Sequence, residues 1–161
     1  MTRRLTTRTR WRDKLYKDQP ARIVNVPPPS WRRFGGARVV IPRPLDVDAL
    51  IRRVPRGRLA TLGMIRSALA RRYRADSACP LCTGIFLRIA AEAAEEARAA
   101  GRRRISPWWR VVREDGRLNE RLPGGAAEQA RRLRAEKHRV APARGRGAPR
   151  VVDFDAVLTK L

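Results

Sequence analysis

Three consecutive segments in the middle of the chain carry apolar residues at helical spacing, and their order restricts the fold more than any other feature. The first helix is expected from about Leu45 and is closed by Pro55. Thr61 is expected to cap the second helix, and Thr83 to cap a third that ends at Gly101. The spacing therefore predicts a compact helical centre.

The character of the sequence changes over residues 105–121. Apolar residues there flank the Asp115-Gly116 turn, which suggests a β-hairpin or an extended wing. A fourth helix is expected from Ala126 to about Lys137. Two helices joined by a turn and followed by a wing predict a mainly α winged helix-turn-helix domain with a small β wing. In that motif the second helix enters a DNA groove and the first braces it.

The two ends of the chain differ from its centre. Residues 1–44 are expected to form a basic, proline-containing N-terminal arm, and residues 45–140 the winged helix-turn-helix domain. Residues 141–161 are expected to form a basic linker and a short C-terminal strand or helical turn. Within the arm, a helix is expected at Trp11–Lys17, and the prolines at 27–29 predict an extended, polyproline-like spacer. The arm is expected to be docked in part, with a disordered tail over residues 1–20 as the alternative.

The chain is strongly basic, with a net charge of +23 over 161 residues. Residues 1–43 hold twelve Arg or Lys against Asp13 and Asp18 only. A positive field of this size favours a polyanion, and binding through phosphates releases counterions and depends on salt. Double-stranded DNA is the expected partner, and an acidic protein or ribosomal RNA are the alternatives.

Composition restricts the class of protein further. No apolar run approaches the ~18 residues of a membrane span, and the N-terminus lacks the apolar centre of a secretory signal. A monomeric cytoplasmic protein associated with the nucleoid is expected, without a membrane partner and with no cofactor. Cys79 and Cys82 have the spacing of a redox pair or half a zinc site. Over both of these we prefer two ordinary reduced cysteines that flank the start of a helix, and we expect no metal site.

The segment Pro107-Trp108-Trp109-Arg110-Val111-Val112 resembles the active-site segment of the O6-alkylguanine-DNA alkyltransferases, in which Pro-Cys-His-Arg-Val carries a nucleophilic cysteine. The resemblance covers roughly residues 45–138. It includes the segment at 54–61, which looks like the entrance to the family's helix-turn-helix. The turn at 115–116, the glycine pair at 124–125 and a closing helix at 127–137 follow in the family's order.

Trp108 stands at the position of the cysteine and Trp109 at that of the histidine. An indole has no ionisable nucleophile, so the chain resembles the non-catalytic, alkyltransferase-like branch of the family. Glu136 or Lys137 lies near the position of the family's buried glutamate. The family's tyrosine is replaced by Leu62, and no arginine aligns with the one that fills the gap left by a flipped nucleotide.

This resemblance implies a non-enzymatic protein that binds alkylated guanine in DNA and marks it for nucleotide-excision-repair proteins. One alternative is a sequence-tolerant DNA-binding or regulatory protein with a vestigial lesion pocket. A third hypothesis is an active enzyme in which Cys79 or Cys82, and not the residue at position 108, is the nucleophile.

The candidate DNA-binding residues fall into three groups. Trp108 and Trp109 are expected to line a lesion pocket, or else to anchor the core, and Arg110 to contact phosphate or base or to form an ion pair. The start of the third helix is expected to offer the backbone N–H groups of Thr83 and Gly84, with Arg88 reaching the groove. The expected phosphate contacts are Arg56, Arg58, Arg66, Arg102, Arg103 and Arg104.

Overall fold

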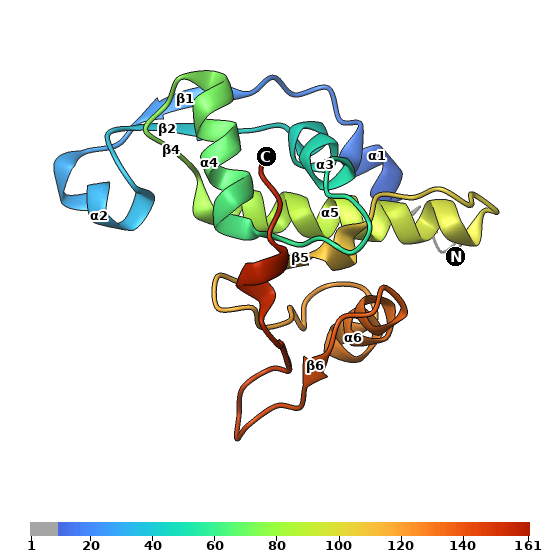
Figure 1. Cartoon of the computed structure of the whole chain (residues 1–161). Helices are drawn as coiled ribbons and strands as arrows, with labels where there is room; N and C mark the ends of the chain where they lie inside the picture. Colours follow the sequence, from blue (N-terminus) through green and yellow to red (C-terminus); the bar gives the residue numbers. More distant parts are fainter. Residues whose placement is uncertain (1–9) are drawn as a thin grey trace, which may run out of the picture.

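A long helix, α5 (Pro80–Ala99), runs through the middle of the protein, and the other elements pack around it (Figure 1). The computed structural model describes residues 10–161. Its helices are α1 (Trp11–Leu15), η1 (Pro28–Ser30), α2 (Trp31–Phe34), α3 (Pro44–Arg52), α4 (Leu62–Tyr73), α5, η2 (Trp108–Arg110), α6 (Gly125–Ala135) and η3 (Phe154–Val157). Its strands are β1 (Arg22–Asn25), β2 (Arg38–Ile41), β3 (Ala60–Thr61), β4 (Ser77–Ala78), β5 (Val111–Val112), β6 (Val140–Ala141) and β7 (Arg150–Val151).

A three-stranded sheet connects the N-terminal segment to the centre of the protein. Strand β1 runs antiparallel to β2, and β2 runs parallel to β4, with Val40 opposite Ala78. Both of these side chains are fully buried. Because β4 leads directly into α5, the sheet fixes the position at which α5 begins. The helix predicted at Trp11 is confirmed as α1, while residues 1–9 of the predicted arm lie outside the described residues.

All four predicted central helices are present, as α3, α4, α5 and α6. The Thr61 cap is confirmed, since its hydroxyl accepts a 3.1 Å hydrogen bond from the Met64 N–H. Helix α5 begins earlier than predicted, because Pro80 with its fixed φ occupies the first turn and Cys79 is the capping residue. Thr83 does not cap α5. It lies inside the first turn, where its hydroxyl donates to the Cys79 carbonyl at 2.7 Å.

The hairpin alternative for residues 105–121 and the extended proline spacer are both wrong. No two-stranded hairpin forms over residues 105–121 in the described chain. Strand β5 pairs in parallel with β3 instead, and Asp115-Gly116 only reverses the chain. The prolines at 27–29 are not an extended spacer, because the Ser30 N–H donates to the Pro27 carbonyl and closes a 3₁₀ turn.

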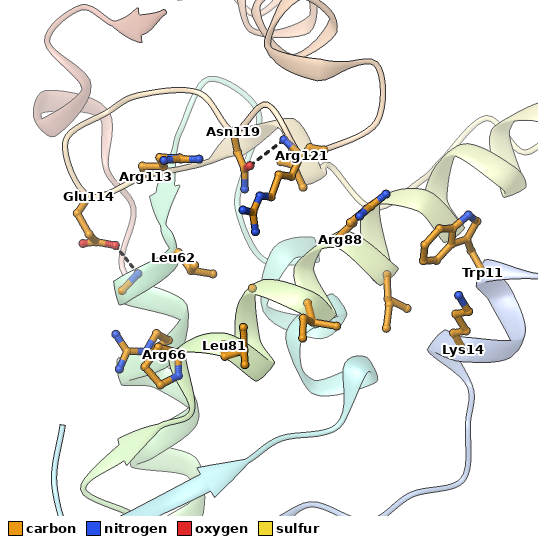
Figure 2. Close-up of a pocket in the computed structure, with 16 residues that line it drawn as sticks. Trp11, Lys14, Leu62, Arg66, Leu81, Arg88, Arg113, Glu114, Asn119 and Arg121 are labelled. Atoms are coloured by element: carbon orange, nitrogen blue, oxygen red, sulfur yellow. Dashed lines mark hydrogen bonds between the residues drawn. The ribbon is translucent and has the colours of Figure 1, made fainter. Parts of the chain in front are cut away.

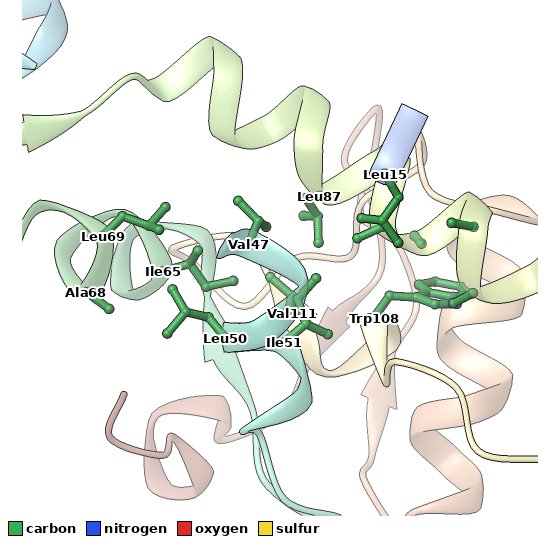
Figure 3. Packing of buried hydrophobic residues seen from close by; sticks show 14 of the residues in the cluster. Leu15, Val47, Leu50, Ile51, Ile65, Ala68, Leu69, Leu87, Trp108 and Val111 are labelled. Carbon is green, nitrogen blue, oxygen red and sulfur yellow. The ribbon is translucent and has the colours of Figure 1, made fainter. Parts of the chain in front are cut away.

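The buried apolar residues form two clusters. The larger one joins α3, α4, α5 and η2, and Figure 3 shows Ile51, Leu87 and Trp108 in it. The smaller one lies under α6 and the C-terminal segment, with Leu118, Leu133 and Val151 at its centre. Trp109 packs against both clusters. Within residues 10–161, no helix is both long and apolar enough to cross a membrane.

Candidate nucleic-acid interface

A groove of about 780 Å³ opens where α4 and α5 begin, and the loop after β5 forms its opposite wall (Figure 2). Helix α5 supplies the floor, with Leu81, Gly84, Ile85 and Arg88. Leu62, at the first position of α4, also lines the groove. The groove therefore brings together the two helices that the sequence predicted as a DNA-binding pair.

The charged side chains that line this groove are mainly cationic. Among the described residues the lining contains five cations and one carboxylate, Glu114. The cations are Lys14, Arg66, Arg88, Arg113 and Arg121. Arg88 is half exposed, and its guanidinium lies 3.9 Å from the Glu92 carboxylate. A phosphate in the groove would meet a predominantly positive surface.

The carboxylate that lines the groove, Glu114, occupies the start of α4. Glu114 accepts a short hydrogen bond from the Gly63 N–H, as Figure 2 shows. A Cβ atom at position 63 would lie 2.7 Å from the carboxylate atoms of Glu114, so a side chain there would displace this carboxylate. The N-terminus of a helix favours an anion through its free N–H groups and its dipole. In this structure a side-chain carboxylate takes the place that a phosphate could take.

The far end of the groove is built by α1. The Glu96 carboxylate of α5 accepts hydrogen bonds of 3.0 Å from the backbone N–H groups of Trp11 and Arg12 and so docks α1 on α5. The Trp11 ring then lies 4.1 Å from the Lys14 ammonium and 5.7 Å from the Arg88 guanidinium. Trp11 and Lys14 were not among the predicted site residues, because nothing near them in the sequence indicates that α1 packs beside the groove.

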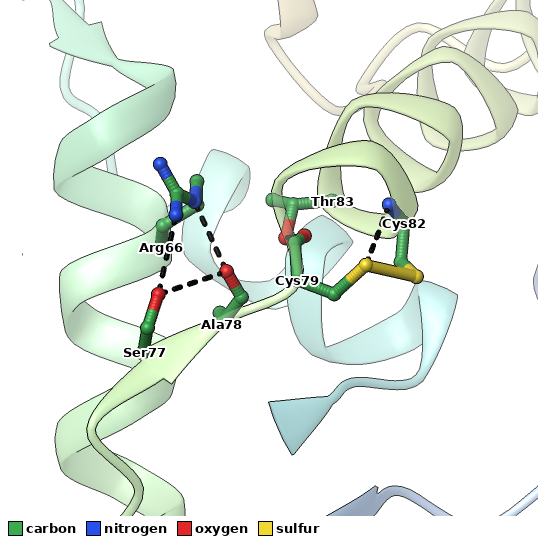
Figure 4. Close-up of a disulfide and its surroundings, with 6 residues drawn as sticks. All are labelled: Arg66, Ser77, Ala78, Cys79, Cys82 and Thr83. Atoms are coloured by element: carbon green, nitrogen blue, oxygen red, sulfur yellow. Dashed lines mark hydrogen bonds between the residues drawn. A yellow bond between two sulfur atoms is a disulfide. The ribbon is translucent and has the colours of Figure 1, made fainter. Parts of the chain in front are cut away.

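Cys79 and Cys82 are joined by a disulfide across the first turn of α5, with Cα atoms 5.3 Å apart (Figure 4). The prediction of two reduced cysteines is therefore wrong, while their place at a helix start is confirmed. Beside them, Arg66 donates to the Ala78 carbonyl at 3.1 Å and to the Ser77 hydroxyl at 3.2 Å. The guanidinium of Arg66 thus ties α4 to β4 at the edge of the groove.

Trp108 lies in the core and not in the groove. Its side chain is fully buried, and its indole N–H donates to the Glu95 carboxylate at 3.0 Å. Arg132 of α6 donates to the same carboxylate at 2.6 Å, and its guanidinium lies 5.4 Å from the Trp108 ring. Trp108 was expected either to line a lesion pocket or to anchor the core. In this conformation it anchors the core, because the buried ring offers no face to a base.

Trp109 and Arg110 converge on one carboxylate at the end of α6. The Trp109 indole N–H donates to Glu136 at 3.0 Å, and Arg110 donates to it through both Nε and Nη2. Glu136 also accepts from the Gly57 N–H, and its side chain is only 5% exposed. Burial would raise the pKa of Glu136, but the hydrogen bonds from Arg110 and Trp109 prevail, and the pKa is lowered.

This network answers two questions that the sequence left open. Glu136, and not Lys137, takes the position of the predicted buried glutamate, and its partner is an indole. Arg110 forms an ion pair of 2.7 Å with Glu136, and its side chain is 14% exposed. Of the roles predicted for Arg110, the structure therefore presents the ion pair. The pair of tryptophans and Arg110 therefore join η2 to α5 and α6.

The remaining predicted residues do not gather at one place. Gly84, Arg88 and Arg66 line the groove, whereas Thr83 is fully buried beneath it. Arg102 and Arg104 line a separate cavity of about 560 Å³ at the other end of α5. Three exposed residues line neither cavity: Arg56, Arg58 and Arg103.

Comparison with known proteins identifies the fold. Neither a protein-family model nor a curated protein sequence matches the chain. A solved structure of Atl1 from S. pombe, in complex with damaged DNA containing O6-carboxymethylguanine, is similar with a TM-score of 0.51 and 19% identity. A second structure of the S. pombe protein with DNA gives 0.45 and 18%. Each likeness covers 73% of this chain and 94% of the other. The chain therefore has the fold of the alkyltransferase-like protein Atl1, as the resemblance of its sequence predicted.

Proposed function

We propose that this protein binds double-stranded DNA without enzymatic activity and recognises O6-alkylguanine-type lesions. It would leave the lesion in place and mark it for nucleotide-excision-repair proteins. The observation that carries the proposal is the cationic groove at the starts of α4 and α5, in which five cations face one carboxylate. Cations around an open groove at two helix N-termini are what phosphate contacts require.

The fold supports the same conclusion. The S. pombe structure of the same fold holds DNA that contains O6-carboxymethylguanine. A likeness in fold alone does not transfer function, so the argument depends on the groove of this chain. Two of its cations, Arg66 and Arg88, lie on α4 and α5, the helices that the helix-turn-helix motif assigns to DNA.

The chemistry at η2 supports a non-enzymatic role. Alkyl transfer requires a thiolate, and the corresponding side chain here is the buried indole of Trp108. Both cysteines of the chain are paired with each other in the disulfide. The hypothesis of a nucleophilic Cys79 or Cys82 is therefore not supported, because neither residue is a free thiol in this structure.

A paired binding titration tests the proposal. One short duplex carries a single O6-methylguanine and the other an unmodified guanine, and each is titrated at two salt concentrations. A lesion preference of about tenfold or more, equal to ~1.4 kcal/mol, supports lesion recognition. Absence of binding to both duplexes contradicts the whole proposal. Mass spectrometry of the protein after incubation with the lesion duplex should show no added alkyl group.

One observation favours a second candidate, a sequence-tolerant DNA-binding or regulatory protein. Trp108, the residue expected to form the wall of a lesion pocket, is enclosed in the core and cannot stack on a base without leaving it. Equal binding to both duplexes, with a steep dependence on salt, would support this candidate over the first.

A further inference from the structure

The exposed face of α5 in the groove is apolar near its N-terminus. Leu81 is 67% exposed and Ile85 is 49% exposed, and both line the groove. They are four residues apart, so their side chains lie one above the other on the same face of the helix. Leaving two large apolar side chains in water forgoes the stabilisation that burial would give. We therefore expect a ligand to cover the exposed side chains of Leu81 and Ile85 on α5.

Gly84 lies on the same face, between these two side chains. A glycine inside a helix weakens it relative to alanine. Neither space nor backbone conformation demands this glycine: a Cβ atom at position 84 would meet nothing within 4 Å, and φ is not positive. Its effect is to leave the helix backbone bare at the centre of the groove, where another molecule can approach closely.

The surroundings of this apolar pair identify the chemistry of the occupant. Three cations line the groove with it: Arg88 one turn further along α5, Arg66 on α4 and Arg121 on the opposite wall. An apolar partner protein would not need these cations. A polyanion with an apolar interior would match both the cations and the apolar pair. Duplex DNA has that composition, with charged strands and stacked bases between them.

We propose that Leu81 and Ile85 form an apolar wedge that enters between base pairs of a bound duplex and unstacks them. Gly84 lets the duplex come close enough for the wedge to reach the bases, and the cations hold the phosphates. Proteins that bend DNA insert leucine or isoleucine side chains in this way. The inference rests on the proposed function, and it adds how the protein would open the DNA.

The test uses the full chain and a short duplex with 2-aminopurine placed at successive positions, since this base brightens when it is unstacked. Wild-type protein should raise the fluorescence at one position. Ile85→Ala and Leu81→Ala should each weaken binding about tenfold, a loss of ~1.4 kcal/mol, and abolish the rise at saturating protein. Because the lost contacts are apolar, the dependence of affinity on salt should not change.

Two further variants separate the wedge from general effects. Ile23→Ala removes the same side chain from β1, where it is 38% exposed outside the groove, and should bind and unstack DNA like wild type. Gly84→Ala should raise the melting temperature of the protein while it weakens binding, because it stabilises α5 but holds the duplex away. Weakened binding together with a lowered melting temperature would contradict this account of Gly84.

The outcomes distinguish the wedge from the proposed function. Tight binding with unchanged fluorescence at every position, or Ile85→Ala binding like Ile23→Ala, overturns the wedge and leaves DNA binding intact. The latter result would be expected if the apolar pair served a protein partner. Absence of binding to any duplex overturns both inferences together.

Discussion

The indole nitrogen of Trp109 lies 3.0 Å from the carboxylate of Glu136, and the same carboxylate holds the guanidinium of Arg110. Three groups from η2 and the turn after α3 thus depend on one acidic side chain at the end of α6. In the resemblance to alkyltransferases this is the position where a glutamate orients a histidine. Here the acidic partner remains and the group that it holds cannot act as a base, so the contact serves the fold.

Replacing Glu136 with glutamine should therefore destabilise the protein strongly. The substitution leaves the Arg110 guanidinium, with 14% side-chain exposure, without its counter-charge. Breaking a buried pair in this way costs about 3–5 kcal/mol. Urea unfolding should show this loss, whereas Glu120→Gln, at an exposed position, should change the free energy of unfolding by less than ~0.5 kcal/mol. Equal stability of the two variants would mean that the network contributes nothing.

Trp108→Ala should also act on stability. The ring is fully buried, so its removal leaves a cavity in the core, at a cost of about 3–5 kcal/mol. Thermal and urea unfolding measure this change. Trp31→Ala is the matched control, because that indole is 45% exposed, and it should cost ~1 kcal/mol or less. A Trp108→Ala protein of normal stability that loses only its lesion preference would place this indole in the pocket instead.

Neutralising Glu114 should strengthen DNA binding. Glu114→Gln removes the carboxylate that lines the groove and frees the start of α4 for a phosphate, which we expect to raise affinity about threefold. Asp115→Asn removes an equal charge from the next residue, which does not line the groove. Fluorescence anisotropy on one duplex compares the two variants. The same gain in both would show that only net charge matters.

Arg88 should contribute to the salt dependence of binding. Arg88→Ala should reduce the slope of log affinity against log salt by about one, as expected for the loss of one phosphate contact. Arg98→Ala removes the same charge from the far end of α5, outside the groove, and should leave the slope unchanged. If Arg98→Ala had the larger effect, the DNA would lie on the other end of the helix.

The stability of the protein should fall in mild acid because of His138. Burial lowers its pKa below the ordinary value of 6.5, an effect that Arg110 reinforces and Glu136 opposes. Its Nε2 is buried and has no hydrogen-bond partner among residues 10–161. The folded state thus keeps the ring neutral, while the unfolded chain takes up a proton as the pH falls through 6.5. This contribution to stability is present above pH 6.5 and decreases as the pH falls towards 5.

Urea unfolding of wild type and His138→Phe at pH 7 and pH 5 isolates this contribution. His138 is the single histidine of the chain, so its removal should reduce the loss of stability over that interval. The lowered pKa values of Asp46, Glu128 and Glu136 place the titration of these carboxylates at more acid pH. An identical loss in both proteins would show that His138 is not responsible.

The local sequence determined the central helices and several of their ends. Apolar spacing located α3, α4, α5 and α6, and the Thr61 cap followed from a single hydroxyl. These features depend on contacts within about four residues, so the sequence contains them directly. The motif at residues 107–112 likewise indicated the family fold without any structure.

The positions of side chains that meet across long separations in the sequence depend on tertiary packing. Trp108 could have faced a ligand or the core, and its burial depends on Glu95 and Arg132, which come from two other helices. Strand β5 pairs with β3, about fifty residues away, instead of forming a local hairpin, and Trp11 reaches the groove only because Glu96 docks α1. Such contacts depend on how helices and strands pack together, and a pattern of neighbouring residues does not carry that information.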